Sequence, residues 1–346
     1  MVSTDAVVDR LLAGDARATA RAISLLEMGD GRGAALLQAV HERSPRRGAP
    51  VGLTGTPGAG KSTLVNALTV DARHRQRRVA IVAVDPNSTR SGGAFLGDRI
   101  RMLDLVMDDG VYMRSIGSRG DKGGLSVTTG EVVDLLTRLP FDEVLVESVG
   151  IGQIESDIRT VVDTTVLVVT PGGDDIQVQK AGTSEGADVF AVNKADQPGA
   201  TELARWIEQS VAMGHHGGWK PPVVTTVGHD VGSVAALWAA IEDHRAHLAA
   251  DGNDTARIAD RLRARVTQIV GSTASSWAEA RLRTDEALVA RLRDGEPASL
   301  IAQRLLENLT AEHGVAGPPG SLDAVGTDGR AKPRAVDAGA AAPLPG

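Results

Sequence analysis

Hydrophobic residues in the first fifty positions recur at helical spacing. Between residues 5 and 28 the apolar positions fall three or four apart, and Gly14-Asp15 interrupts them with a turn signal. This pattern predicts two short helices. A third helix is expected over residues 33–42, before a basic, proline-ended linker at 43–50. We therefore expect an N-terminal helical extension over residues 1–48.

The pattern changes after the linker, where short β-branched runs alternate with longer helical stretches. Several of these runs are apolar without alternation, which is typical of parallel strands buried on both faces. The sequence thus predicts an α/β domain over residues 49–250, with a mostly parallel, doubly wound sheet and a closing helix at 234–248. The six expected strands are residues 51–54, 79–84, 144–146, 165–169, 189–192 and 223–226.

Charged helical sequence replaces the strands beyond residue 250. Over 255–312 an apolar stripe that includes Ile258, Leu262 and Val266 runs along one side, which predicts a C-terminal helical segment over 251–313. The stripe needs a surface to pack on, either the first domain or a second copy of the chain. The remainder, 314–346, is Gly, Ala and Pro with scattered charge, so we expect it to be disordered.

Composition narrows the class of protein. The chain has 346 residues and no cysteine, so disulfides, thiolate metal sites and iron–sulfur clusters are excluded. A formal net charge of -7 disfavours binding to nucleic acid or an anionic membrane. The N-terminus lacks the pattern of a signal peptide, and no apolar run is long enough to span a bilayer. We expect a soluble cytoplasmic protein.

A phosphate-binding loop follows the first expected strand. The segment satisfies G-x-x-x-x-G-K-[ST] and leads into a helix, as the motif requires. Glycines let backbone N–H groups turn towards phosphate oxygens, Lys61 is expected to bridge the terminal phosphates, and the Ser62 hydroxyl to ligate Mg²⁺. The fold is therefore predicted to be that of a P-loop NTPase. The loop consists of Gly55, Thr56, Pro57, Gly58, Ala59, Gly60, Lys61, Ser62 and Thr63.

The strand expected at 189–192 ends in an N-K-x-D tetrad that favours guanine. The Asp196 carboxylate can accept from guanine N1–H and from the exocyclic amine, a donor pair that adenine does not offer. Asn193 is expected to brace the loop, and the Lys194 stem to lie over the base. The segment Thr226-Val227-Gly228, after the last strand, is placed to offer backbone N–H groups to the guanine oxygen. GTP is thus the expected nucleotide.

Carboxylates at strand ends supply candidates for Mg²⁺ and for hydrolysis. Glu147 begins E-x-x-G where many GTPases place D-x-x-G, so it can hold Mg²⁺ through water. Asp85 and Asp98 can reach the same metal or position water, although each is equally well explained as a helix cap. The predicted metal ligands are Ser62, Asp85, Asp98 and Glu147, and the predicted catalytic residues are Lys61, Asp98 and Glu147.

Three further features concern movement and metal. Ile151 stands directly after the E-x-x-G glycine, where it cannot orient water, so slow intrinsic hydrolysis is expected. Residues 114–124 are interpreted as a mobile loop in which Arg119 contacts phosphate, a partner or only solvent. Residues 174–180 form another loop at a strand end that could follow the nucleotide state. His215-His216, and His244 with His247, lack carboxylates at ligand spacing, so metal storage is not expected.

The chain resembles the MeaB/ArgK family of P-loop GTPases, which are associated with methylmalonyl-CoA mutase. Seven segments carry the likeness, of which the one at 82–102 is the most specific to the family. The resemblance spans about residues 6–312. The matching segments are GTPGAGKST at 55–63, VAVDPNSTRSGGAFLGDRIRM at 82–102, SRGDKGGLS at 118–126, ESVGIGQIESDI at 147–158, PGGDDIQVQKAG at 171–182, NKAD at 193–196 and PPVVTTVGHDVGSVAALW at 221–238.

The resemblance implies a homodimeric GTPase chaperone for an adenosylcobalamin-dependent acyl-CoA mutase, which gates cofactor loading and protects or reactivates the mutase. It implies a phosphate, Mg²⁺ and hydrolysis site that contains Lys61, Ser62, Asp85, Asp98 and Glu147. Gln177 and Lys180 would belong to a third switch that joins the nucleotide state to the partner. The C-terminal helices would form the dimer.

Two other classes of function compete with this one. A kinase would transfer phosphate to a protein or a small molecule, as an older transport-kinase label for the family suggests, but it has no need of guanine selection. A GTPase metallochaperone would share the nucleotide core, but such proteins carry Cys or His clusters and this chain has no cysteine. The regulatory GTPase is the preferred hypothesis.

Overall fold

The computed structural model describes residues 3–85, 107–117, 127–148, 158–172, 187–214, 218–228, 230–250 and 253–313. The chain divides into two compact units, Met1–Ser272 and Thr273–Gly346. The first unit holds the sheet and the N-terminal helices. Among the described residues, no helix combines the length and the apolar character needed to cross a membrane.

Three short helices open the first unit, as predicted. They are α1 (Thr4–Leu12), α2 (Ala16–Glu27) and α3 (Gly31–Arg43). Each begins after a polar residue whose side chain accepts from a free backbone N–H of the first turn: Ser3, Asp15 and Asp30. Their apolar faces pack together and against α7 (Val127–Leu136), and α2 also contacts the strand at the sheet edge.

Seven parallel strands form one sheet in the order β3-β2-β4-β1-β5-β6-β7. All six expected strands are confirmed, each within one residue of the predicted bounds at either end. The strands are β1 (Val51–Gly55), β2 (Val79–Asp85), β3 (Val111–Gly117), β4 (Glu143–Glu147), β5 (Thr164–Val169), β6 (Val189–Asn193) and β7 (Val223–Thr226).

The edge strand β3 corrects the interpretation of residues 114–124 as a loop. Residues 114–117 lie in β3 and pair in parallel with β2, so that part of the expectation was wrong. The strand is only half-buried and carries Arg114, which bonds to Glu27 and Ser24 of α2. The charged Arg114 made this strand hard to recognise from the sequence, because Glu27, which neutralises the charge, lies 87 positions away.

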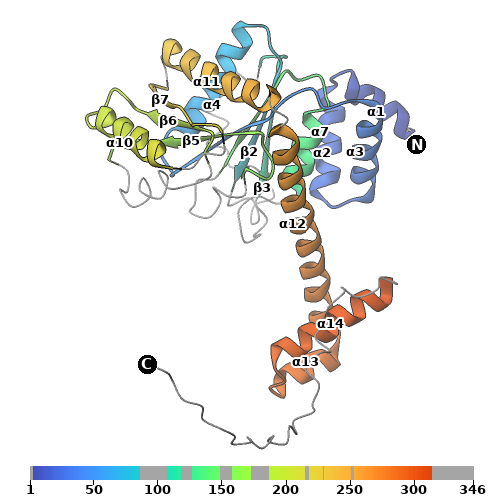
Figure 1. The fold of residues 1–346 in the computed structure, drawn as a ribbon. Helices are drawn as coiled ribbons and strands as arrows, with labels where there is room; N and C mark the ends of the chain where they lie inside the picture. Colours follow the sequence, from blue (N-terminus) through green and yellow to red (C-terminus); the bar gives the residue numbers. More distant parts are fainter. Residues whose placement is uncertain are drawn as a thin grey trace, which may run out of the picture. The chain divides into compact units, whose positions relative to one another are not determined.

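Helices cover both faces of the sheet, as a doubly wound fold requires (Figure 1). One face packs against α4 (Lys61–His74) and α11 (Val231–Ala250). The other face packs against the N-terminal helices, α7 and, near β6, α10 (Ala200–Met213). The predicted α/β class with N-terminal and C-terminal helices is therefore confirmed.

The predicted C-terminal helical sequence forms α12 (Asn253–Thr284), α13 (Glu286–Arg293) and α14 (Ala298–His313). In the first unit, α12 is held to the sheet domain by Arg261, which pairs with Asp163, and by Arg265, which pairs with Asp134. In the second unit, a small apolar core joins α13 and α14 to the end of α12. Its buried residues are Leu288, Ile301 and Leu305.

Candidate nucleotide-binding site

The topology brings the predicted motifs to one edge of the sheet. Strand β1 lies between β4 and β5, the point at which the strand order reverses and where doubly wound sheets bind their ligands. The phosphate loop follows β1, while Glu147, Asn193 and Thr226 are the last residues of β4, β6 and β7. Because all these strands are parallel, their carboxyl ends meet at the same edge.

At two positions of the phosphate loop, backbone conformation and close contacts both require glycine. Gly55 has φ 139°, and a Cβ there would lie 2.1 Å from the Val168 carbonyl oxygen of β5. Gly60 has φ 91°, and a Cβ there would lie 2.3 Å from Nδ2 of Asn193. These glycines let the loop close on its neighbours. The loop thereby runs directly into the N-terminus of α4, where free N–H groups favour an anion.

Lys61 begins α4 and folds back over the phosphate loop. Its Nζ donates to the carbonyl oxygens of Gly55 at 2.9 Å and Thr56 at 3.0 Å, and the residue is only 6% exposed. Burial lowers the pKa of the Lys61 ammonium, while the nearby charge of Glu147 acts in the opposite direction. A desolvated ammonium held at the loop interacts strongly with phosphate oxygens.

Ser62 and Glu147 meet as the sequence predicts for a shared metal. The Ser62 hydroxyl donates to Oε1 of Glu147 at 2.5 Å, across 85 residues of sequence. Hydroxyl and carboxylate oxygens are the donors that Mg²⁺ prefers, usually with phosphate oxygens and water completing the shell. Within the described ranges, His, Cys, Asp and Glu form no cluster of three or more that could hold a metal by itself. The donor set fits Mg²⁺ bound together with a nucleotide.

A buried hydroxyl pair beside Glu147 was not predicted from the sequence. Ser148 Oγ donates to Thr54 Oγ1 at 2.9 Å, and the Ser148 N–H donates to the Leu53 carbonyl at 3.0 Å. Both hydroxyl-bearing residues are 2% exposed. These bonds fix the end of β4 against β1, which carries the phosphate loop. No spacing in the sequence indicates the pair, because 94 residues separate its members.

Asn193 links the predicted guanine tetrad to the phosphate loop. Its Nδ2 donates to the Ala59 carbonyl at 2.8 Å, and its Oδ1 accepts from the Thr226 hydroxyl at 3.2 Å. The residue is 2% exposed, so both bonds are sheltered from water. The brace expected of Asn193 therefore exists, and it spans three strand ends.

The remaining predicted guanine residues surround this brace. Lys194 has a left-handed backbone, φ 57°, and Asp196 is exposed. The Ala195 N–H donates to the Thr226 carbonyl at 3.0 Å, which holds the tetrad beside the β7 loop. A Cβ on Gly228 would lie 2.8 Å from the Thr63 side chain, so this loop also borders the phosphate loop. In the same loop, the Val227 N–H donates to the Ser233 hydroxyl.

Several predicted residues fall outside the described part of the chain. Asp85 ends β2, but only its backbone is described. Asp98, Arg119, Gln177 and Lys180 lie outside the described residues, as do the histidines at 215 and 216. Their roles stay predictions.

The second histidine pair, His244 and His247, is packed against buried polar and aromatic groups, and a carboxylate that lies far away in the sequence approaches His244. His244 on α11 is fully buried; its Nδ1 lies 2.9 Å from the Thr164 hydroxyl and its Nε2 lies 3.6 Å from the Asp188 carboxylate. The rings of His244 and His247 both lie about 5 Å from Trp219. This cluster sits where β5 and β6 begin, at the opposite edge of the sheet from the phosphate loop.

Several known proteins are similar to this chain in sequence. The family model described as "Methylmalonyl Co-A mutase-associated GTPase MeaB" matches residues 19–282. A protein of Pyrococcus horikoshii, whose name gives it provisionally as a GTPase, is 39% identical over 316 residues, covering 89% of this chain and 99% of that protein. GTPase ArgK of Escherichia coli is 35% identical over 254 residues, covering 71% of this chain and 77% of that protein.

Among solved structures, the crystal structure of an LAO/AO transport system kinase has the same fold. It aligns with a TM-score of 0.67 and 22% sequence identity, covering 90% of this chain and 99% of that chain. At this identity the likeness establishes the fold and not the activity.

Proposed function

Since the chain belongs to the MeaB family of methylmalonyl-CoA mutase-associated GTPases, we propose that its GTPase cycle serves an adenosylcobalamin-dependent acyl-CoA mutase. In this proposal it acts as a chaperone that gates cofactor loading and protects or reactivates the mutase. The family description supports a link to the mutase. The observation that carries the nucleotide part is the meeting of Lys61, Ser62 and Glu147 beside the phosphate loop.

The proposed roles follow from the chemistry of each group. Backbone N–H groups of the phosphate loop and of the first turn of α4 bind phosphate oxygens. The Lys61 ammonium exchanges its two carbonyl acceptors for oxygens of the terminal phosphates, where it offsets the charge that develops as the bond breaks. Glu147 and Ser62 orient the metal side of the site. Asp98 completes the proposed catalytic set by positioning water.

Mg²⁺ is the metal that we propose for this site. When bound, it neutralises charge on the nucleotide phosphates and orients them. The Ser62 hydroxyl and the Glu147 carboxylate lie within hydrogen-bond distance of each other, so together they would hold one cation. Asp85 and Asp98 are the further proposed ligands. Removal of divalent cations is therefore expected to abolish hydrolysis of GTP.

We propose that the guanine base lies against the N-K-A-D loop. The Asn193 side chain bonds to Ala59 and Thr226, whereas the carboxylate of Asp196 is exposed and would accept from the two guanine donors. Val227 and Gly228 close the other side. The bond between Asn193 and Ala59 ties base recognition to the phosphate loop, so a correctly seated base also supports the phosphate site.

We propose that three loops change conformation between the GTP-bound and GDP-bound states and transmit this change to the partner. The segment after Glu147 is one, and Arg119, Gln177 and Lys180 belong to the other two. We further propose that the chain acts as a homodimer in the cytoplasm through its C-terminal helices. Because Ile151 cannot orient water, intrinsic turnover is expected to be slow and to rise when the partner binds.

The deciding experiment measures phosphate release by the purified chain with GTP or ATP, alone and with candidate adenosylcobalamin-dependent mutases. We expect slow, GTP-specific turnover that one mutase accelerates. Lys61→Ala should lower turnover by about 10²–10³-fold, whereas the exposed Lys220→Ala should not change it. GTP turnover that no mutase alters would refute the chaperone role, and phosphate found on an acceptor would favour a kinase.

A further inference from the structure

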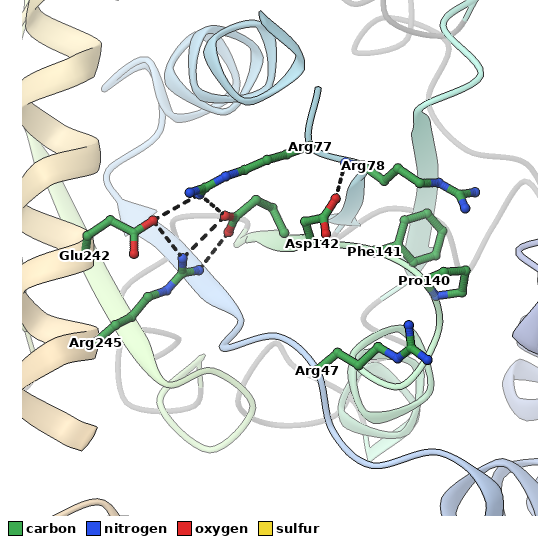
Figure 2. Close-up of a pocket in the computed structure, with 9 residues that line it drawn as sticks. Arg47, Arg77, Arg78, Pro140, Phe141, Asp142, Glu242 and Arg245 are labelled. Carbon is green, nitrogen blue, oxygen red and sulfur yellow. Dashed lines mark hydrogen bonds and ion pairs between the residues drawn. The ribbon is translucent and has the colours of Figure 1, made fainter. Parts of the chain in front are cut away.

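A pocket of about 520 Å³ lies where strands begin, at the opposite edge of the sheet from the phosphate loop. Figure 2 shows that the residues lining it come from four parts of the chain: the linker before β1, the residues just before β2, the segment that leads into β4, and α11. Four of its nine residues are arginines. The four arginines are Arg47, Arg77, Arg78 and Arg245.

One wall of the pocket is an ion-pair network whose charges cancel. The carboxylate of Glu143, 2% exposed, binds Arg77 at 2.6 Å and Arg245 at 2.8 Å. Glu242 binds the same two arginines at 3.0 and 3.4 Å. Arg245 also donates to the Ala49 carbonyl at 2.7 Å. Because each guanidinium has two carboxylate partners, this wall is rigid and is not the part that attracts a charged ligand.

The other wall leaves two arginines without a carboxylate. Within the described part of the chain, neither Arg47 nor Arg78 forms an ion pair. Of the three acids that line the pocket, Glu143 and Glu242 pair with the other two arginines, which leaves Asp142. The Asp142 carboxylate accepts from the backbone N–H of Arg78 at 2.7 Å, and its single negative charge offsets only one of the two arginines. The open side of the pocket therefore carries a local positive charge, although the whole chain has a formal charge of -7.

The guanidinium of Arg78 is held in place without a salt bridge. It stacks on the Phe141 ring, with its central carbon 5.5 Å from the ring centroid. On its other side it lies against the turn between α1 and α2, because a Cβ on Gly14 would be 2.8 Å from both of its terminal nitrogens. A fixed guanidinium loses less conformational entropy on binding an anion than a free one does.

We propose that this pocket binds a small multivalent anion through phosphate or carboxylate groups. Arg47 and Arg78 would supply charge-assisted hydrogen bonds, which suit both kinds of oxygen. The volume falls within the range of about 300–1,000 Å³ that is common for small-molecule sites. This volume suits a molecule of metabolite size.

The site is separate from the nucleotide site. Strand β4 begins with Glu143 in this pocket and ends with Glu147 beside the phosphate loop. At about 3.3 Å per residue, the two lie well over 10 Å apart. An anion here therefore leaves Lys61 and Ser62 untouched, and both sites can be filled at once. The inference does not depend on the proposed function.

The test is calorimetric titration of the full chain with citrate and, separately, with pyrophosphate, in the presence of saturating GDP. GDP blocks the phosphate loop, and its own titration is measured first. We expect at least one probe to bind one equivalent beside GDP. Arg47→Ala and Arg78→Ala should each weaken that binding about tenfold or more. Arg205→Ala, which removes an exposed arginine from α10, is the matched control.

The two probes distinguish phosphate from carboxylate chemistry. Citrate does not resemble the nucleotides that bind a phosphate loop, so citrate binding tests the pocket even if GDP does not bind. A failure of GDP to bind would contradict only the proposed function. Arg47 is exposed on the linker, so Arg47→Ala should fold normally, and thermal unfolding checks this for both variants. The proposal is overturned if neither probe binds the GDP-saturated chain, or if Arg47→Ala binds as the control does.

Discussion

Lys194 adopts a left-handed backbone, φ 57°, in the middle of the N-K-A-D loop. This conformation is uncommon for residues with a Cβ and has to be stabilised by its surroundings. Here the flanking residues are tied down: Asn193 to the phosphate loop and Ala195 to β7. Single residues therefore fix the shape of the site.

Asp196→Asn should change the base preference. Asparagine offers one acceptor and one donor where the carboxylate offers two acceptors, so it mismatches guanine but matches xanthine, which has a carbonyl in place of the amine. Affinity for GTP should fall by about 10²-fold or more, and xanthosine triphosphate should bind better than GTP. Asp196 is exposed, so folding is unaffected. Unchanged affinity for GTP in nucleotide titrations would contradict the assigned role.

Tyr112 should titrate at unusually high pH. Burial raises its pKa to about 12, the effect of Glu27 adding to this and that of Arg114 opposing it. The folded pKa lies above the unfolded value of about 10, so the stability from Tyr112 is fully present below about pH 10 and is lost as the pH rises towards 12.

The chain has a single tyrosine, so the ultraviolet absorbance of tyrosinate reports Tyr112 alone. We expect a midpoint near pH 12 in native protein and near 10 in urea-unfolded protein. Tyr112→Phe should lack the transition. A midpoint near pH 10 in native protein would show that the Tyr112 ring is not desolvated in the folded state.

Among the elements, the neighbouring strands β1 and β4 hold the phosphate loop and the carboxylate of Glu147 next to each other. Strand β1 delivers the phosphate loop and β4 delivers Glu147, and their register is fixed by three pairs that begin with Val51 and Leu145. Beyond the register, the Ser148–Thr54 hydroxyl bond fastens the two strand ends. The relative position of Lys61 and Glu147 therefore depends on this pair of strands.

Thr54→Val should test that dependence. The change keeps the shape of the side chain but removes the acceptor of the buried Ser148 hydroxyl, so the free energy of unfolding should fall by about 1–2 kcal/mol. GTP hydrolysis should fall as well, because Ser148 directly follows Glu147. Thr54→Ser keeps the hydroxyl and is the control. Equal denaturation midpoints and equal turnover in the two variants would contradict the coupling.

At the scale of the whole molecule, α12 presents two different faces within the first unit. Arg261 and Arg265 hold one face to the sheet domain through Asp163 and Asp134. The stripe of Leu262, Val266 and Val270 is 49, 57 and 62% exposed. From the sequence, either the first domain or a second copy of the chain could cover this stripe. Because the three residues are exposed, the first domain does not cover them. A second copy of the chain is the expected cover.

Val266→Lys combined with Val270→Lys should convert the expected dimer into a monomer, because it places two charges in the apolar stripe. Sedimentation velocity at several protein concentrations measures the change in mass. Ala264→Lys adds a charge to an exposed position on another face of the same helix and should leave the dimer intact. A wild-type chain that sediments as a monomer at every concentration would refute the dimer itself.

Much of this architecture follows from the sequence because its signals are local. A buried parallel strand is a short apolar run, and the phosphate loop and the N-K-A-D tetrad are contiguous segments whose chemistry is readable without coordinates. Helix limits of the N-terminal extension were predictable from turn residues such as Gly14-Asp15. The bracing role of Asn193 was also predictable, since the residue type and the strand end suggested it.

Other features were decided only by the tertiary structure, because they join residues far apart in the chain. Strand β3 carries the charged Arg114, which is neutralised by Glu27 of α2. The buried His244 contacts Thr164 and Asp188, which lie 80 and 56 residues earlier in the chain. The Ser148–Thr54 bond and the arginine pocket likewise depend on which strands are neighbours. Sequence alone determined the elements and their chemical motifs; packing determined which distant polar groups neutralise one another and which remain free to bind.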